Sequence, residues 1–410
     1  MEKKKILVLH VALAVGGAET VLLNYLNILT KNPEYQVDLA VFEGGEKNHL
    51  EKIDSSIKVD FLLNEIETQF SRYTYWKSKQ SNISDSDRRY YSSWDSHISN
   101  TRLERLKNKI KKENYDLIID FQGIVITFIT PEFIKTIKKP IISWIHSDSD
   151  FERWEYNVEN TKQKLDYISS FVAICMDMKK KYANALENRF LSNKEVYTLY
   201  NPLDINKVLN LANEEVSELD QDLLNYPFIL QVARLDERQK NHLKMIDLFA
   251  KLKEKGIKEK LYIIGNGNSY AILQEKIKEL GLENECLLLG SRTNPMPFMR
   301  RANLFIHTAN YEGLGMVLIE SMICGVPVVA FDCPTGPREI LADGKYGELI
   351  PMGNDELFIE KTYELLSHEE KRQHYISLLP EAVERFSFEQ IEHDFFALIE
   401  KTISENNSLN

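Results

Sequence analysis

The sequence has little cysteine, and its few cysteines are not spaced for metal binding. Its four cysteines form no C-x-x-C pair, and none lies near a histidine at metal-ligand spacing; they are Cys175, Cys286, Cys324 and Cys333. We therefore expect buried thiols in a reducing compartment, with neither disulfides nor a structural zinc site. The expected location is the cytoplasm.

The sequence also lacks an apolar run of the roughly 20 residues that a membrane-spanning helix needs. The first residues, MEKKK followed by ILVLHVALAV, place basic residues before an apolar stretch, as a signal peptide does. This stretch ends at Gly16-Gly17, a helical pattern follows, and there is no polar cleavage region. A buried first strand is the favoured interpretation.

Positive charge is scarce in the second half of the chain. The net charge is -11, and residues 1–200 hold 29 Lys and Arg against 28 Asp and Glu, which leaves 22 against 34 for the remainder. The acidic half is not suited to nucleic acid. Basic clusters at residues 102–112 and 179–181 suit a membrane surface or an anionic acceptor, or they are solvated helix faces.

Short apolar runs that alternate with helical patterns predict an α/β protein built on parallel sheets. The runs lie at residues 6–13, 37–42, 117–119, 141–145, 171–174, 228–233, 261–264, 286–289, 304–307, 326–330 and 348–350. The alternation restarts after Tyr200-Asn201-Pro202-Leu203-Asp204, and 410 residues are too many for one core. We expect two doubly wound, Rossmann-like domains, at 1–203 and 204–385, with a ligand cleft between the carboxyl ends of their strands. A helix at 386–410 is expected to return to the first domain.

Residues 64–100 interrupt this pattern, and we expect an irregular insertion there. The stretch is rich in Ser, Asp and Asn, and its aromatic residues include Tyr73, Tyr75, Trp76, Tyr90, Tyr91 and Trp94. Long loops in compact domains often have a function, and aromatic rings with polar neighbours suit a saccharide acceptor. The same residues could instead cover part of the sheet or contact a partner protein.

The strongest functional signal is the stretch from Tyr311 to Glu320, which follows an expected strand and opens a helix. The segment Gly313-Leu314-Gly315-Met316-Val317 lets backbone N–H groups approach a ligand, and the start of the helix favours an anion such as a diphosphate. Glu320 lies about 9 Å further along the helix axis, where a carboxylate can accept two hydrogen bonds from a ribose. Glu312 lies on the other side of the phosphate, where a sugar is expected. Taken alone, two glutamates eight residues apart also fit a surface helix.

Three further stretches follow expected strands. Arg234 and Lys240 can clamp a diphosphate and stabilise its charge as it leaves, or they belong to a solvated loop. Gly16-Gly17 lies at the first strand–helix turn, without the G-x-G-x-x-G spacing of a dinucleotide site. His146 would face the same cleft, although a lone histidine is more often structural.

In their order along the chain, these motifs resemble the retaining glycosyltransferases of family 4, which have the GT-B fold. The resemblance is strong over residues 228–350 and weak over 45–115. It is carried by the E-x7-E pattern of Glu312 and Glu320, Gly325-Val326-Pro327-Val328-Val329-Ala330, Ala233-Arg234-Leu235 with Lys240, Gly265-Asn266-Gly267, Asn201-Pro202 and Gly16-Gly17-Ala18-Glu19. Pro334-Thr335-Gly336-Pro337-Arg338-Glu339 resembles the subset that builds bacterial surface polysaccharides.

The resemblance implies a role for each matched position. Arg234 and Lys240 would bind the donor diphosphate and Glu320 the ribose. Glu312 would contact the hydroxyls of the transferred sugar, together with backbone groups from Gly313 to Met316.

It also implies contacts from other loops. Gly17, with Gly16 beside it, would border the phosphate, and His146 would lie against the sugar near the reacting centre. The base would pack near Gly265 and the loop that ends at Asn294.

The implied activity is transfer of a hexose or N-acetylhexosamine, with retention, from a nucleotide sugar to a glycan hydroxyl. UDP is the expected nucleotide, and a lipid-linked or surface glycan at the inner membrane face is the expected acceptor. We expect no cofactor and no metal site. Asp148-Ser149-Asp150 has the D-x-D spacing of some metal sites, but it lies in the N-terminal half of the chain, away from the predicted phosphate site. The alternatives are a sugar-nucleotide epimerase and a non-catalytic partner in polysaccharide assembly.

Overall fold

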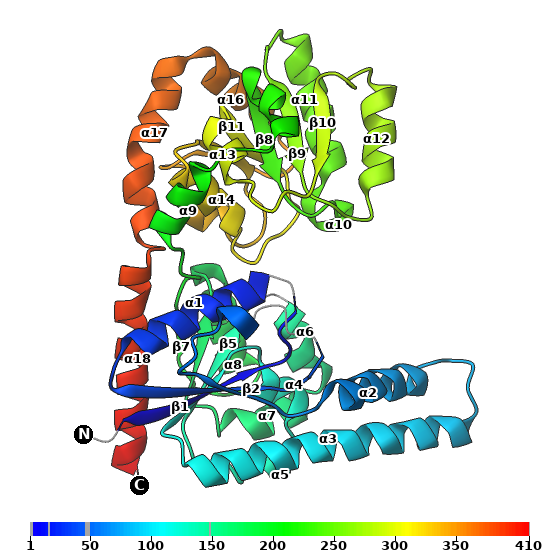
Figure 1. The fold of residues 1–410 in the computed structure, drawn as a ribbon, viewed down its shortest axis with the longest axis vertical. Coiled ribbons are helices and arrows are strands. Elements are labelled where there is room, and N and C mark those ends of the chain that lie inside the picture. The colour runs from blue at the N-terminus through cyan, green and yellow to red at the C-terminus, as the bar shows by residue number, and fades with distance from the viewer. Residues whose placement is uncertain (1–2, 15–16, 46–49, 147–148, 410) are drawn as a thin grey trace. The chain divides into compact units, whose positions relative to one another are not determined.

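The structure is a computed structural model that describes residues 3–14, 17–45, 50–146 and 149–409. The chain divides into two compact units (Figure 1). One comprises residues 1–202 and 392–410, and the other comprises residues 203–391. The unit boundary thus falls after Pro202, where the sequence predicted it after residue 203. No helix among the described residues is both long and apolar enough to cross a membrane.

The first unit is built on a parallel seven-stranded sheet in the order β3-β2-β1-β4-β5-β6-β7. Its strands are β1 (Lys4–His10), β2 (Tyr35–Val41), β3 (Lys58–Phe61), β4 (Leu117–Asp120), β5 (Ile141–Ile145), β6 (Ser170–Ala173) and β7 (Val196–Thr198). The apolar N-terminal run is therefore a central strand, since β1 pairs with both β2 and β4. The sequence did not predict the short edge strands β3 and β7.

Helices connect these strands and cover the sheet. They are α1 (Gly17–Lys31), η1 (Leu50–Lys52), α4 (Ile124–Phe128), α5 (Pro131–Ile134), α6 (Ser149–Tyr156), α7 (Val158–Leu165) and α8 (Met176–Asn188). Strand order and helical connections together give a doubly wound sheet, as predicted.

The predicted irregular insertion at 64–100 is wrong, because most of it is helical. Helices α2 (Glu65–Ser78) and α3 (Asp85–Glu113) form a hairpin that projects from the first unit (Figure 1). Asn64 and Glu67 form a capping box at the start of α2, and Ser84 caps α3. These caps satisfy N–H groups that have no partner within the helix, which explains how a polar sequence forms two helices.

The C-terminal helix α18 (Phe388–Leu409) packs through its later residues on the first unit. The ring of Phe395 lies 5.0 Å from that of Tyr25 and 5.6 Å from that of Trp144, both edge-on. Lys4 forms an ion pair with Glu400, whose other oxygen accepts a hydrogen bond from the hydroxyl of Tyr35 at 2.7 Å. An aromatic cluster and an ion pair thus hold the end of the chain against the first strands.

The second unit is built on a parallel six-stranded sheet in the order β10-β9-β8-β11-β12-β13. Its strands are β8 (Phe228–Val232), β9 (Lys260–Ile264), β10 (Cys286–Gly290), β11 (Leu304–His307), β12 (Val328–Phe331) and β13 (Glu348–Ile350). Its helices are α9 (Ile205–Ala212), η2 (Glu218–Asn225), α10 (Glu237–Lys240), α11 (His242–Glu254), α12 (Tyr270–Glu279), α13 (Met296–Arg301), α14 (Met316–Ile323), α15 (Pro337–Ile340), α16 (Asp355–Ser367) and α17 (Glu369–Glu384). All strands predicted in this half are present. Because the strands are parallel, the loops after β8, β11 and β12 leave one edge of the sheet together.

Phe395→Ala should destabilise the protein by about 3–5 kcal/mol, since it removes a buried ring from a packed aromatic cluster. Urea unfolding followed by circular dichroism measures the change. His393→Ala, on an exposed position of the same helix, is the matched control and should leave the midpoint unchanged. Equal midpoints for both variants would show that this cluster does not anchor α18.

Candidate active site

The carboxylate of Glu312 is the centre of a buried polar cluster in the second unit. Its side chain is only 6% exposed, and Oε1 lies 2.5 Å from Lys240 Nζ and 2.9 Å from His307 Nε2. Both contacts involve Oε1, and within the described part of the chain no hydrogen bond is recorded to Oε2. One oxygen is thus held in place while the other is available to a ligand.

Three loops at the edge of the sheet meet at this carboxylate. His307 is the last residue of β11, Lys240 ends α10 after β8, and Thr335 follows β12 and donates a hydrogen bond to the carbonyl of Glu312. The backbone N–H of Glu312 donates to the carbonyl of Pro334 at 3.2 Å. The parallel topology therefore brings together residues that lie up to 95 positions apart in the sequence.

Sequence reasoning identified Glu312 and Lys240 but missed His307 and Gln231. Gln231 Nε2 lies 3.4 Å from His307 Nδ1, and both side chains are fully buried. When Gln231 donates to Nδ1, the ring proton is on Nε2, which lies 2.9 Å from Glu312 Oε1. A histidine at the end of a predicted strand can face the ligand edge of the sheet. From the sequence, we expected this of His146 and did not consider His307.

The charges around Glu312 keep it ionised. Burial alone would raise its pKa, but the hydrogen bond and charge of His307, followed by those of Lys240, outweigh burial and lower the pKa to about 2. Nearby His242 is fully buried, and burial, then the charges of Lys240 and His307, lower its pKa to about 4. Lys240 therefore faces a carboxylate that carries its charge at neutral pH.

Arg234 lies in the loop between β8 and α10 and is exposed. Its Nη2 donates to Gln239 Oε1 at 3.2 Å, and Gln239 in turn contacts the carbonyl of Tyr311 at 3.4 Å. The backbone of Asn310 also bonds to this loop, through a 2.8 Å contact with the carbonyl of Gln239. Arg234 thus belongs to the same group of loops as Glu312, with its guanidinium accessible to an anion.

The helix predicted to receive a diphosphate starts as expected. Gly315 precedes α14 with φ of 88°, which favours glycine, and no side chain caps the helix. The first N–H groups of α14, from Met316 and Val317, therefore have no side-chain acceptor among the described residues. A Cβ on Gly336 would lie 2.1 Å from the carbonyl of Leu314, so glycine lets the next loop brace Gly313 to Gly315.

Glu320 lies one turn inside α14. Its side chain is half-buried, and no hydrogen bond or ion pair to it is recorded for the described residues. Burial raises its pKa to about 7. Among the described residues, the carboxylate of Glu320 therefore has no hydrogen-bond or ion-pair partner, in contrast to that of Glu312.

The residues predicted to surround the base have structural partners. A Cβ on Gly265 would lie 1.8 Å from the carbonyl of Ala233, so glycine is required there for the loops after β8 and β9 to pack. Asn294 Nδ2 donates to the carbonyl of Leu211 and to Glu214, both at 2.8 Å. These contacts explain both residues without a ligand, and a base contact there stays a prediction.

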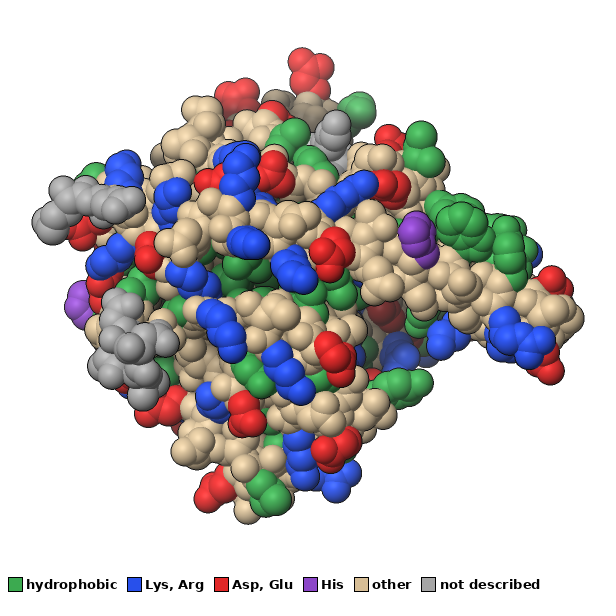
Figure 2. Space-filling view, turned by 90° about the horizontal axis from the view of Figure 1, so that it is seen from below, with side chains coloured by type: hydrophobic (Ala, Val, Ile, Leu, Met, Phe, Trp, Pro, Cys, Tyr) green, Lys and Arg blue, Asp and Glu red, His purple; other side chains and the backbone are tan. Residues whose placement is uncertain are grey.

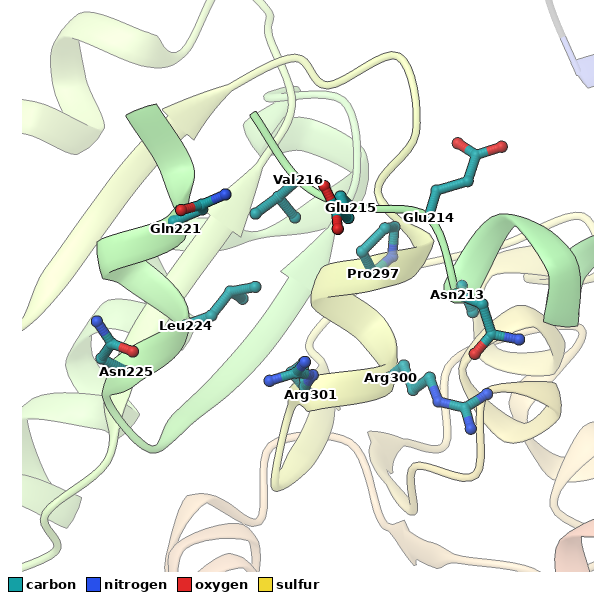
Figure 3. A pocket seen from close by; sticks show the side chains of 11 residues that line it. Asn213, Glu214, Glu215, Val216, Gln221, Leu224, Asn225, Pro297, Arg300 and Arg301 are labelled. Carbon is teal, nitrogen blue, oxygen red and sulfur yellow. The ribbon is translucent and has the colours of Figure 1, made fainter. Parts of the chain in front are cut away.

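A separate cavity of the second unit lies nearby (Figure 3). It measures about 360 Å³ and lies between η2 and α13, lined in part by Glu214, Glu215, Arg300 and Arg301. None of the predicted donor-binding residues lines it, so it is not the predicted donor site.

In the first unit, His146 follows β5 and lines a cavity of about 380 Å³. The other lining residues include Gln122, Thr127 and Arg153. His146 Nε2 lies 2.5 Å from the carbonyl of Phe121, which fixes the ring at the carboxyl edge of the sheet. Gly17 is the first residue of α1, and Gly16 lies outside the described residues, as does Asp148.

The four cysteines are buried, and none of these four residues forms a disulfide. This agrees with the expectation of buried thiols. The described residues contain no group of three or more His, Cys, Asp or Glu side chains placed to hold a metal ion.

Comparison with known families finds a match within the second unit. Residues 217–378 match the family described as glycosyl transferases group 1. The second unit is therefore similar in sequence to the glycosyl transferases of group 1. The match contains Arg234, Lys240, Glu312 and Glu320, so the candidate donor site lies within the matched residues.

A curated relative and two solved structures extend the comparison. The N-acetylgalactosamine-N,N'-diacetylbacillosaminyl-diphospho-undecaprenol 4-alpha-N-acetylgalactosaminyltransferase of Campylobacter jejuni is 33% identical over 49% of this chain. The match spans only about half of that relative, 53% of its length.

The solved structures match almost the whole chain. The lipopolysaccharide outer core galactosyltransferase WaaB is 21% identical with a TM-score of 0.70, covering 97% of this chain and 99% of its own. Anabaena HepE in complex with UDP and glucose is 19% identical with a TM-score of 0.71, covering 97% and 100%. The fold is therefore that of the GT-B glycosyltransferases, as predicted.

The raised pKa of Glu320 predicts a pH-dependent stability. Because its folded pKa of about 7 exceeds the ordinary value of 4.5, the ionised form destabilises the fold. Glu320→Gln should therefore gain stability relative to the parent as pH rises from 4.5 to 7, by about 1–3 kcal/mol, and the gain should level off above pH 7.

Chemical unfolding between pH 4.5 and 8 measures this difference. Glu279→Gln, on an exposed position of α12, is the matched control and should show no such trend. A difference for Glu320→Gln that does not change with pH would contradict the burial of its carboxylate.

Proposed function

We propose that this chain is a retaining glycosyltransferase. It transfers a hexose or N-acetylhexosamine from a nucleotide sugar, with UDP as the expected nucleotide, to a hydroxyl of a lipid-linked or surface glycan. The observation that carries the proposal is the Glu312 carboxylate, fixed through Oε1 by Lys240 and His307 beside the uncapped start of α14. Support also comes from relatives named as glycosyltransferases and from the UDP and glucose named with HepE.

The donor diphosphate would bind at the start of α14. Helix N–H groups and the dipole favour an anion there, and Arg234 is accessible in the adjoining loop. Glu320 lies one turn further on and has no partner in the described part of the chain; it would accept hydrogen bonds from the ribose hydroxyls. Such bonds favour the ionised carboxylate, so donor binding should lower the pKa that burial raises.

Glu312 would bind the hydroxyls of the transferred sugar through Oε2. Its low pKa means that it acts as a hydrogen-bond acceptor rather than as a general acid. Lys240 and His307 act by orienting it, and Lys240 also adds positive charge close to the phosphate. The amine of Lys240 contacts Glu312, and its contact with the donor diphosphate stays a prediction.

The reaction needs no side-chain nucleophile. The bond between the anomeric carbon and the diphosphate oxygen breaks, and the acceptor oxygen forms a new bond on the same face. The acceptor proton passes to the departing phosphate oxygen. Arg234, Lys240 and the α14 amides stabilise the leaving charge.

Arg234→Ala and Lys240→Ala should each reduce donor turnover by about two orders of magnitude or more, because each removes positive charge from the leaving group. Turnover is measured with a nucleotide sugar and a lipid-linked glycan acceptor. Arg238→Ala removes a nearby exposed arginine, for which no side-chain hydrogen bond or ion pair to another described residue is recorded, and should retain activity. Lys240→Ala also leaves Glu312 without its cation, so its folded state is checked by circular dichroism.

Near-normal turnover in both variants would contradict the assignment. Full turnover in the presence of EDTA is expected, since these cations take the role that a metal has elsewhere.

The two alternatives are tested with donor alone. Thermal shift against a panel of nucleotide sugars identifies the donor, and Glu320→Ala should abolish the shift because the ribose contact is lost. An isomerised sugar nucleotide would indicate an epimerase, and the absence of donor binding would indicate a non-catalytic protein. Hydrolysis or transfer without isomerisation supports the transferase.

A further inference from the structure

Helix α2, the first helix of the hairpin, has its polarity reversed relative to an ordinary surface helix. The buried residues of α2 are the hydroxyl-bearing Thr68, Thr74 and Ser78. Thr74 and Ser78 donate to carbonyls of their own helix, at 3.0 Å and 2.8 Å. The large apolar residues of α2 are exposed instead: Ile66, Phe70, Tyr73, Tyr75 and Trp76. Polar groups face inward and aromatic rings face the surroundings, which indicates that something covers the rings.

The rings of both helices join into one surface, which we call the aromatic face. It consists of the exposed Phe70, Tyr73, Tyr90 and Trp94 and the half-buried Tyr91. The rings of Phe70 and Trp94 lie 5.6 Å apart, those of Tyr73 and Tyr91 5.9 Å, and those of Tyr90 and Tyr91 5.5 Å. All three contacts are edge-to-face, so the helices hold the rings in a fixed array. In Figure 2, hydrophobic side chains gather on this hairpin, at the right of the view.

Basic residues border the aromatic face. Lys77 Nζ lies 5.7 Å from the ring of Tyr73 and 5.1 Å from that of Trp76. Lys79 and Arg89 are exposed, and no ion pair is recorded for either among the described residues. Residues 65–113 hold eleven Lys and Arg against seven Asp and Glu, in a chain whose net charge is -11. The hairpin therefore has the opposite charge to the rest of the chain.

We propose that the hairpin binds the surface of an anionic phospholipid bilayer, with the aromatic face in the interfacial layer. Tyr and Trp side chains favour this layer, where one end of the ring is apolar and the other is wet. Lys77, Lys79 and Arg89 are positioned for lipid phosphates, and attraction to an anionic surface accounts for the local excess of positive charge. A saccharide would need open ring faces with hydrogen-bonding groups beside them, whereas these rings pack edge-to-face on a projecting surface.

The placement of the four tryptophans provides a direct readout. Trp76 and Trp94 are 56% and 38% exposed in the hairpin, whereas Trp144 and Trp154 are buried in the first unit. Vesicles of phosphatidylcholine with 30–50% phosphatidylglycerol, roughly the anionic content that recruits basic interfacial segments, should therefore shift the emission to shorter wavelength. Pure phosphatidylcholine vesicles should give little shift, and about 0.5 M salt should weaken the response because it screens the charges.

Variants connect the response to the hairpin. Phe70→Ser combined with Trp94→Ser should reduce co-sedimentation with anionic vesicles at least tenfold, and Lys79→Gln combined with Arg89→Gln should reduce it severalfold. Tyr156→Ser combined with Leu219→Ser removes two highly exposed apolar residues elsewhere and should bind as the parent does. Trp76→Phe combined with Trp94→Phe should keep co-sedimentation but lose the emission shift.

Three results would overturn the proposal. One is a folded parent that does not sediment with anionic vesicles. The second is vesicle binding that the Phe70 and Trp94 variant leaves unchanged. The third is a concentration-dependent dimer in analytical ultracentrifugation that this variant abolishes, which would assign the aromatic face to a second copy of the chain. None of these results bears on donor turnover, so the proposed function is tested separately.

Discussion

A buried carboxylate stays ionised only where cations or strong donors offset the loss of water, and Glu312 imposes this requirement on the second unit. Lys240 at the end of α10 and His307 at the end of β11 contact the carboxylate and offset its loss of water. The loop after β12 fixes the Glu312 backbone through Thr335 and Pro334. Helix α14 begins at Met316, four residues after Glu312 in the sequence. The geometry of the whole site therefore depends on the loops of three parallel strands arriving at one point of the sheet edge.

The sequence was sufficient for the fold because its strands are continuous apolar runs, which parallel sheets buried on both faces require. It also predicted that Arg234 and Glu312 follow such runs and that Glu320 lies in the next helix, as the structure has them, while their roles stay predictions. It could not show that Lys240 contacts Glu312, since 72 residues separate them and only the strand order makes them neighbours. For the same reason His307 and Gln231, each within a strand, looked like core residues. The sequence interpretation placed Gly265 near the base of the donor. In the structure, the carbonyl of Ala233 lies so close that only glycine fits at this position.

The hairpin shows where sequence patterns fail for a different reason. Hydrophobic periodicity finds a helix by its buried face, but α2 buries hydroxyl groups and the first half of α3 buries almost nothing. Its aromatic residues therefore looked like an irregular stretch. The capping residues Asn64 and Ser84 could have predicted these helices. A Ser, Thr or Asn followed three residues later by an acidic residue marks the start of a helix, even when the helix has no buried apolar face.

The buried thiols make the two units separately observable. Cys175 lies in the first unit, whereas Cys286, Cys324 and Cys333 lie in the second, and burial raises the pKa of the latter three. Alkylating reagents attack the thiolate, so a folded unit protects its cysteines from them. Peptide-resolved alkylation at increasing denaturant would then record the opening of each unit within the same molecule. Without any introduced label, the wild-type chain reports whether its halves unfold together or in sequence.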